Sequence, residues 1–260
     1  MPKLSPALYA AAAAGALLTG SIATAAPVVI EDFATADGAR EFGLFGRSVQ
    51  PGGSNVGQAS GTTSISLTQF EFTPEGQTAY FNQLSQTDNP AAPGGNYPDG
   101  TSAWFLRHLA NGGSKGPANT LSETGPQGYV GYYLRTLAPN LVTAIVLDEV
   151  GGSGGIEVST RADIINDGEW HLYQFSLEDI NAWDGFLTAT GNGVLDGTAY
   201  SIDSVAFWQE GPDTGTTAQF DFAYVVYDAD APLVSLVPEP ASAALLIAGG
   251  ALLMGRRRQA

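Results

Sequence analysis

The 260-residue chain contains no cysteine and only two histidines. Without cysteine it cannot form disulfide bonds, a thiol nucleophile or a thiolate zinc site. His108 and His171 occur in no H-E-x-x-H motif, and the chain has no Gly-x-Ser-x-Gly motif. Stability must therefore come from the core, from backbone hydrogen bonds and from any bound metal.

Basic residues are also scarce, with 10 against 26 acidic residues and a net charge of −16. Residues 1–25 and 237–260 hold four of the bases and one of the acids, which leaves 25 acids and 6 bases in residues 26–236. Such a surface repels phosphate backbones and excludes nucleic-acid binding. It favours hard cations such as Ca²⁺, although acidity also simply keeps an exported protein soluble.

The first 25 residues have the pattern of a secretory signal peptide. Lys3 supplies the positive charge, residues 7–18 form an apolar helical stretch, and Ala23-Thr24-Ala25 is a small-x-small cleavage site. An ordinary buried helix would leave that cleavage site unexplained. The sequence therefore predicts export through the Sec machinery and removal of residues 1–25.

The last 24 residues, 237–260, have three parts in a fixed order. The motif Val237-Pro238-Glu239-Pro240 is followed by the uncharged residues 241–254 and then by a basic cluster. A fourteen-residue helix is roughly 21 Å long, shorter than the ~30 Å hydrocarbon core, so it would span a membrane only marginally. The cluster that would hold its end in the cytoplasm consists of Arg256, Arg257 and Arg258.

This order of parts resembles the PEP-CTERM sorting domain. The resemblance implies processing by an exosortase, a membrane protease-transferase, in a Gram-negative bacterium that makes exopolysaccharide. It also implies a precursor tethered in the inner membrane by a short transmembrane helix, followed by a mature protein at the cell surface or in the extracellular matrix. A plain C-terminal membrane anchor is the alternative interpretation.

Residues 26–236 are expected to form a single all-β domain. Nine segments alternate or are rich in β-branched and aromatic residues, and Gly, Pro, Asn or Asp flank them. This pattern predicts a jelly-roll-like antiparallel β-sandwich whose first and last strands are neighbours. The nine expected strands are residues 28–33, 64–72, 101–109, 129–137, 141–147, 156–161, 170–177, 200–208 and 217–227.

A second resemblance covers roughly residues 128–228. The segment Gly168-Glu169-Trp170-His171-Leu172-Tyr173 leads to Leu177, and Phe220-Asp221-Phe222 lies in the last expected strand. This succession is similar to sandwich domains of other PEP-CTERM proteins and to galactose-binding-like carbohydrate modules. In those modules a structural Ca²⁺ often links the first strand to the last. The resemblance therefore implies Glu31, Asp32 and Asp221 as calcium ligands, while solvent-facing carboxylates are the alternative.

Carbohydrate sites combine flat aromatic faces with hydrogen-bonding side chains. Trp170 falls where the core of the sandwich is expected, and we assign it to packing. Trp183 follows Asp179 in an expected loop, where an exposed aromatic ring would be useful. The candidate ligand-binding residues are Trp104, Arg107, Trp183 and Asp184.

Catalysis is not expected. Asp148-Glu149 and Glu178-Asp179 are adjacent carboxylates, but neighbouring residues on a strand point to opposite faces. The glycine-rich residues 151–155 have no following lysine and are expected to form a hairpin loop. We therefore predict a non-enzymatic structural or adhesive surface protein. The alternatives are a module that binds exopolysaccharide and, less favoured, a secreted glycoside-active enzyme.

Overall fold

The computed structural model describes residues 27–31, 49–51, 62–71, 78–87, 102–110, 116, 119–122, 124–152, 155–179, 181–185, 191–211 and 217–234. Within these ranges no helix has the length and apolar character needed to cross a membrane. The predicted signal peptide (residues 1–25) and sorting tail (residues 237–260) lie outside them, so both remain predictions.

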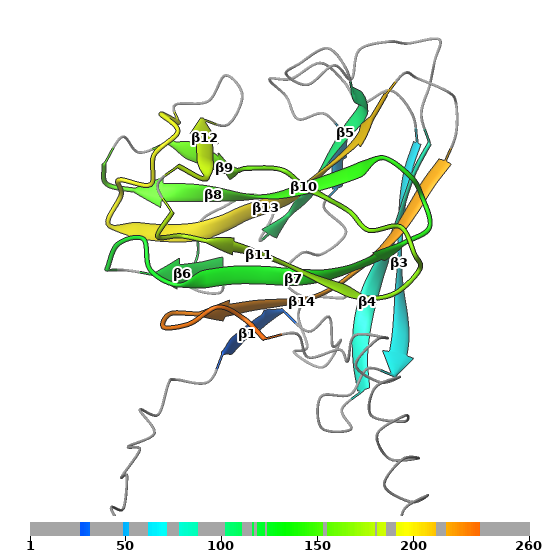
Figure 1. Ribbon diagram of the computed structural model, residues 1–260, viewed down its shortest axis with the longest axis horizontal. Coiled ribbons are helices and arrows are strands. Elements are labelled where there is room, and N and C mark those ends of the chain that lie inside the picture. Colours follow the sequence, from blue (N-terminus) through cyan, green and yellow to red (C-terminus); the bar gives the residue numbers. More distant parts are fainter. Residues whose placement is uncertain are drawn as a thin grey trace, which may run out of the picture.

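The described residues form two antiparallel sheets that lie one above the other (Figure 1). The first sheet has the order β11-β7-β14-β4-β3, and β1 also pairs with β14. Its strands are β1 (Val28–Glu31), β3 (Thr62–Glu71), β4 (Thr78–Thr87), β7 (Tyr129–Thr136), β11 (His171–Ser176) and β14 (Thr217–Asp228).

The second sheet has the order β12-β9-β8-β13-β5-β2, with β10 beside β8 and β6 beside β13. Its strands are β2 (Val49–Pro51), β5 (Ser102–Leu109), β6 (Thr120–Ser122), β8 (Leu141–Val150), β9 (Ile156–Ser159), β10 (Ala162–Asp163), β12 (Trp183–Gly185) and β13 (Ala199–Glu210).

The main core lies between the two sheets. Phe207 of β13 and Phe220 of β14 bring ring centroids within 4.5 Å of each other across the gap. The hydroxyl oxygens of Tyr132 on β7 and Thr143 on β8 lie 2.7 Å apart and form a hydrogen bond between the two sheets. Burial raises the pKa of Tyr132 far above its ordinary value, so this hydroxyl is a neutral core group.

Each sheet also carries a buried apolar cluster on its outer face. On the first sheet this cluster includes Phe81, Tyr133 and Trp170, and on the second it includes Phe105 and Trp208. Both faces of the central strands are therefore covered. This explains why β7 and β8 are almost continuously apolar, because strands that are buried on both faces lose the apolar–polar alternation.

The structure confirms the antiparallel β-sandwich and the expected pairing of the first and last strands. Val28 of β1 lies opposite Tyr227 of β14. Each of the nine expected segments contains a strand, and the glycine-rich residues after Val150 connect the paired strands β8 and β9. Gly151 and Gly152 have φ values of 81° and 55°, a left-handed conformation that favours glycine at this turn.

After β14 the chain turns back over the outer face of the first sheet as a C-terminal strap (residues 229–234). The strap starts where the backbone N–H groups of Asp230 and Ala231 donate to Asp228 Oδ1. Further along, the Leu233 N–H donates to Gln174 Oε1 at 2.9 Å. A Cβ on Gly131 would lie 2.7 Å from Leu233 Cδ1, so the missing side chain makes room for the strap.

Candidate functional site

A cavity of about 580 Å³ opens beside the end of β7, on the outer face of the first sheet. We call it the first cavity. Strands β4, β7, β13 and β14 supply its polar side chains, and the connection from β7 to β8 supplies an apolar wall. The lining residues that matter for its chemistry are Gln83, Arg135, Leu137, Thr217, Gln219 and Asp221.

The floor of the first cavity is a row of three side chains across three neighbouring strands. Asp221 of β14 lies opposite Gln83 of β4 on one side and opposite Arg135 of β7 on the other. Arg135 donates through Nε and Nη2 to Asp221 Oδ2, at 2.9 and 2.6 Å, and Gln83 Nε2 donates to Oδ1 at 3.0 Å. Both carboxylate oxygens are thus bonded, which fixes the row.

Arg135 is also held by two aromatic rings. Its guanidinium carbon lies 4.7 Å from the ring centroid of Trp170 and 5.3 Å from that of Phe81. A guanidinium has five N–H groups, and Asp221 accepts from two of them. The other three have no acceptor among the described residues and are oriented by the rings and the carboxylate.

The rim combines hydrogen-bonding groups with apolar surface. The side-chain amide of Gln219 is exposed and bonds no described residue, and Thr217 Oγ1 lies 2.8 Å from Thr87 Oγ1. Leu137 is 75% exposed, which is high for a large apolar side chain. The cavity therefore offers both donors and acceptors beside an apolar wall, the combination that suits a ligand with hydroxyl edges and a C–H face.

The calcium site predicted from Glu31, Asp32 and Asp221 is not assembled by the described residues. Glu31 is buried opposite Val225, four residues along β14 from Asp221, or roughly 13 Å. Asp32 lies outside the described residues. Within those residues no group of three or more His, Cys, Asp or Glu side chains could hold a metal ion. The calcium site therefore stays a prediction.

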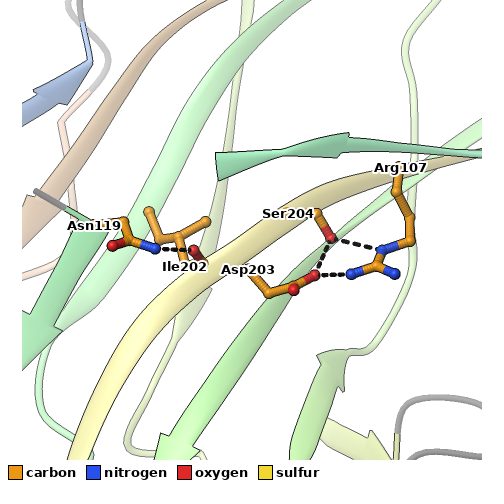
Figure 2. A network of polar contacts seen from close by, with 5 residues as sticks. All are labelled: Arg107, Asn119, Ile202, Asp203 and Ser204. Atoms are coloured by element: carbon orange, nitrogen blue, oxygen red, sulfur yellow. Dashed lines mark hydrogen bonds and ion pairs between the residues drawn. The ribbon is translucent and has the colours of Figure 1, made fainter. Parts of the chain in front are cut away.

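Arg107, a predicted sugar-binding residue, belongs to a buried polar network on the second sheet. Its guanidinium pairs with Asp203, and its Nε donates to Ser204 Oγ at 3.2 Å (Figure 2). The register of β13 shifts between Ile202 and Ser204, which lets two successive polar residues face the same arginine. These contacts give Arg107 a structural role.

The expectation that Trp183 is an exposed loop residue is wrong. Trp183 belongs to β12, is 4% exposed in the main core, and donates from Nε1 to the Ser176 carbonyl at 3.2 Å. The assignment of Trp170 to packing agrees with its place in the outer-face cluster of the first sheet. Trp104 lies on β5 opposite Gln209, and its side chain is outside the described part.

Asp184, the remaining predicted residue, is exposed and lines a second cavity of about 390 Å³. This second cavity lies at the β9–β12 side of the second sheet, and Arg161 and Trp208 also line it. Of the three predicted sugar-binding residues whose side chains the structure describes, Asp184 alone lines either cavity.

Three of the four acidic residues considered for catalysis, Glu149, Glu178 and Asp179, accept hydrogen bonds from backbone N–H groups. Glu149 Oε1 accepts the N–H groups of Asp196 and Gly197, at 3.0 and 3.3 Å. Glu178 Oε1 accepts the Gly128 N–H at 3.2 Å, and Asp179 Oδ1 accepts from Asn181 at 3.1 Å. These contacts fix loops next to the strands.

Glu157 fastens the same loop as Glu149 from a buried position. Its two carboxylate oxygens accept the N–H groups of Asn192 and Gly193, at 2.7 and 2.9 Å. Burial raises the pKa of Glu157 above its ordinary 4.5, the two N–H donors lower it, and the charges of Asp196 and Asp184 raise it further.

This raised pKa predicts a pH dependence of stability. Because the folded pKa lies above the unfolded one, the contribution of Glu157 is present in full below about pH 4.5 and is lost as the pH rises through the folded pKa. We expect the chain to lose unfolding free energy relative to the Glu157→Gln variant between pH 4 and 7. Urea denaturation of both proteins across that range checks this, and a constant difference would contradict it.

Sequence reasoning missed Arg135, Gln83 and Gln219. The one available signal was a charged residue inside a strand that is otherwise apolar and aromatic, because such a charge needs a partner on a neighbouring strand. That partner is Asp221, which the sequence placed between two phenylalanines.

No family model matches the chain, and no curated protein matches it. Among solved structures it is similar to the family 11 carbohydrate-binding module of the cellulosomal cellulase Lic26A-Cel5E of Clostridium thermocellum. The identity is 12%, with 81% of this chain and 98% of that one covered and a TM-score of 0.43.

Two other solved structures are similar at a lower TM-score. A family 30 carbohydrate-binding module has 12% identity, covers 72% of this chain and 91% of its own length, and has a TM-score of 0.36. An exo-beta-agarase has 8% identity, covers 70% of this chain and 24% of its own length, and has a TM-score of 0.38. Likenesses at this level carry no argument about ligand or activity.

Proposed function

We propose that this chain is an exported, non-enzymatic carbohydrate-binding protein of the bacterial surface or extracellular matrix, and that the first cavity binds a neutral glycan. The observation that carries the proposal is the combination in one cavity of pre-oriented donors, the exposed Gln219 amide and an apolar wall. Sugars present hydroxyl groups along their edges and C–H groups on their faces, so each part of the cavity has a partner.

The charges favour a neutral glycan over an acidic one. Arg135 is neutralised by Asp221 at 2.6 Å, and the chain carries a net charge of −16. An acidic polysaccharide therefore meets no free cation among the described lining residues and a repulsive surface around them. Among the described lining residues Asp221 is the one carboxylate, and Arg135 and Gln83 hold it. Glycoside hydrolysis ordinarily uses two carboxylates, which supports binding over cleavage.

The predicted ends of the chain suit this role. Residues 1–25 would direct export, and the Val237-Pro238-Glu239-Pro240 tail with its arginine cluster would be recognised by an exosortase. A glycan-binding body delivered in this way would meet exopolysaccharide outside the cell. Mass spectrometry of the mature C-terminus in cell fractions tests the tail, because cleavage near Pro238 supports sorting and retention through Ala260 supports a plain anchor.

Removing the Gln219 amide is expected to weaken glycan binding about fivefold, the value of one hydrogen bond of roughly 1 kcal/mol. The full chain and the Gln219→Ala variant would be titrated calorimetrically with neutral tetrasaccharides: cellotetraose, xylotetraose, mannotetraose and maltotetraose. Gln127→Ala is the matched control, since Gln127 is another exposed glutamine and lies before the opposite end of β7. Equal weakening by both variants, or none by either, would remove the first cavity as the site.

A further inference from the structure

The second cavity has the composition of a sugar site, although the first cavity already accounts for the proposed function. Its floor is formed by Val158 and Trp208 from the apolar cluster on the outer face of the second sheet. Polar residues from two segments surround this floor. An aromatic ring next to a carboxylate and hydroxyl groups is the arrangement on which a pyranose ring can stack and hydrogen-bond.

The carboxylate of Asp184 is positioned by the sheet and is available for a ligand. Asp184 of β12 lies directly opposite Val158 of β9, so both side chains are on the face that carries Trp208. The Thr160 N–H donates to the Ala182 carbonyl at 2.7 Å, which holds the two segments together beyond the strand pair. Asp184 is exposed and accepts no hydrogen bond from the described residues.

Arg161 covers the aromatic floor of the second cavity. Its guanidinium carbon lies 4.5 Å from the ring centroid of Trp208, which is 1% exposed. Its Nη1 lies 3.9 Å from Oε1 of the exposed Glu210, a distance at which the ion pair contributes little. A short movement toward Glu210 would tighten that pair and uncover the Trp208 ring.

Strand β13 links the two cavities through consecutive residues. Gln209 lines the first cavity and Trp208 lines the second, and successive side chains of a strand point to opposite faces. The two cavities are therefore lined by neighbouring residues of β13, from opposite faces of that strand.

We infer that the second cavity is a second sugar-binding site, in which a pyranose ring stacks on Trp208 once Arg161 has moved toward Glu210, and Asp184 accepts hydrogen bonds from its hydroxyl groups. The ligand class, a neutral glycan, is taken from the proposed function. The contacts that define the second cavity are separate from those of the first. A chain with two such sites would bridge two glycan segments.

Calorimetric titration of the full chain with the same four tetrasaccharides tests the inference. We expect at least one of the four tetrasaccharides to bind at two sites per chain. Asp184→Ala is expected to remove the second site, and Arg161→Ala to tighten it several-fold by uncovering the ring. Glu169→Ala removes an equal charge from an exposed position outside both sets of lining residues and is expected to change neither site.

The outcomes separate the two proposals. A single site that Gln219→Ala weakens and Asp184→Ala leaves unchanged would overturn the inference and keep the proposed function. A single site that Asp184→Ala removes and Gln219→Ala leaves unchanged would keep the inference and overturn the first cavity as the glycan site. No binding of any of the four tetrasaccharides would overturn both.

Discussion

Arg107→Met is expected to lower the free energy of unfolding by about 3–5 kcal/mol, the cost of leaving one member of a buried ion pair without its partner. The side chains of Arg107 and Asp203 are 12% and 3% exposed, so water cannot replace the lost guanidinium. Ser204 Oγ donates to Asp203 Oδ1 at 2.7 Å and remains that carboxylate's one partner among the residues that the structure describes. Urea denaturation at pH 7 measures the loss.

The double variant Arg107→Met with Asp203→Leu is the control for this prediction. It removes both charges, so most of the lost stability should return if the cost comes from the unpaired carboxylate. A loss below 1 kcal/mol for Arg107→Met would contradict the prediction and place the pair among weak surface pairs. Glycan binding by the folded single variant is expected to be unchanged, because Arg107 lines neither cavity.

Asp221→Ala is expected to have the largest effect on glycan binding, a loss of more than tenfold. The variant removes the carboxylate that bonds both Arg135 and Gln83 in the first cavity, which leaves Arg135 with its two ring contacts alone and releases the Gln83 amide. It also removes hydrogen bonds to a charged group that lies largely buried, which should lower the unfolding free energy by about 1.5–3 kcal/mol. Calorimetric titration and urea denaturation measure the two effects separately.

Asp221→Asn separates position from charge. The amide oxygen can still accept from Arg135, so this variant is expected to bind glycan better than Asp221→Ala does. If Asp221→Ala bound glycan as tightly as the unaltered chain does, the row of Gln83, Asp221 and Arg135 would have no part in glycan binding. A calcium-dependent rise in melting temperature that Asp221→Ala abolishes would instead assign Asp221 to the predicted metal site.

The strands that the sequence predicted are those with apolar or β-branched residues in regular positions, such as residues 129–136 and 217–228. β4 (Thr78–Thr87) was missed because six of its ten residues are Thr, Ser, Asn or Gln. Its backbone pairs with β14 along seven positions, while inward-facing Leu84 and outward-facing Phe81 carry its apolar contacts. Such a strand is stabilised mainly by backbone hydrogen bonds to its neighbours, and these do not produce an apolar–polar pattern in the sequence.

The site was harder to predict than the fold because it depends on pairs of residues far apart in the chain. Asp221 was selected as a calcium ligand, which stays a prediction, and its partners in the structure are 86 and 138 positions away. Trp183 was misjudged because flanking Asp and Asn residues suggested a loop, whereas a short edge strand carries the ring into the core. Burial of a tryptophan depends on which strand pairs with its segment, and local composition does not reveal that.

The pairing of β1 with β14 would also affect which way the body faces if residues 237–260 tether the chain. Val28 lies opposite Tyr227, and Leu233 of the strap rests over Gly131, so the chain enters and leaves toward the same end of the first sheet. Thr217 at the first cavity is ten residues from Tyr227 along β14, or roughly 33 Å. If residues 237–260 hold the chain at a membrane on the side of the β1–β14 pair, the Thr217 edge of the first cavity points away from the lipid and into the surrounding polymer.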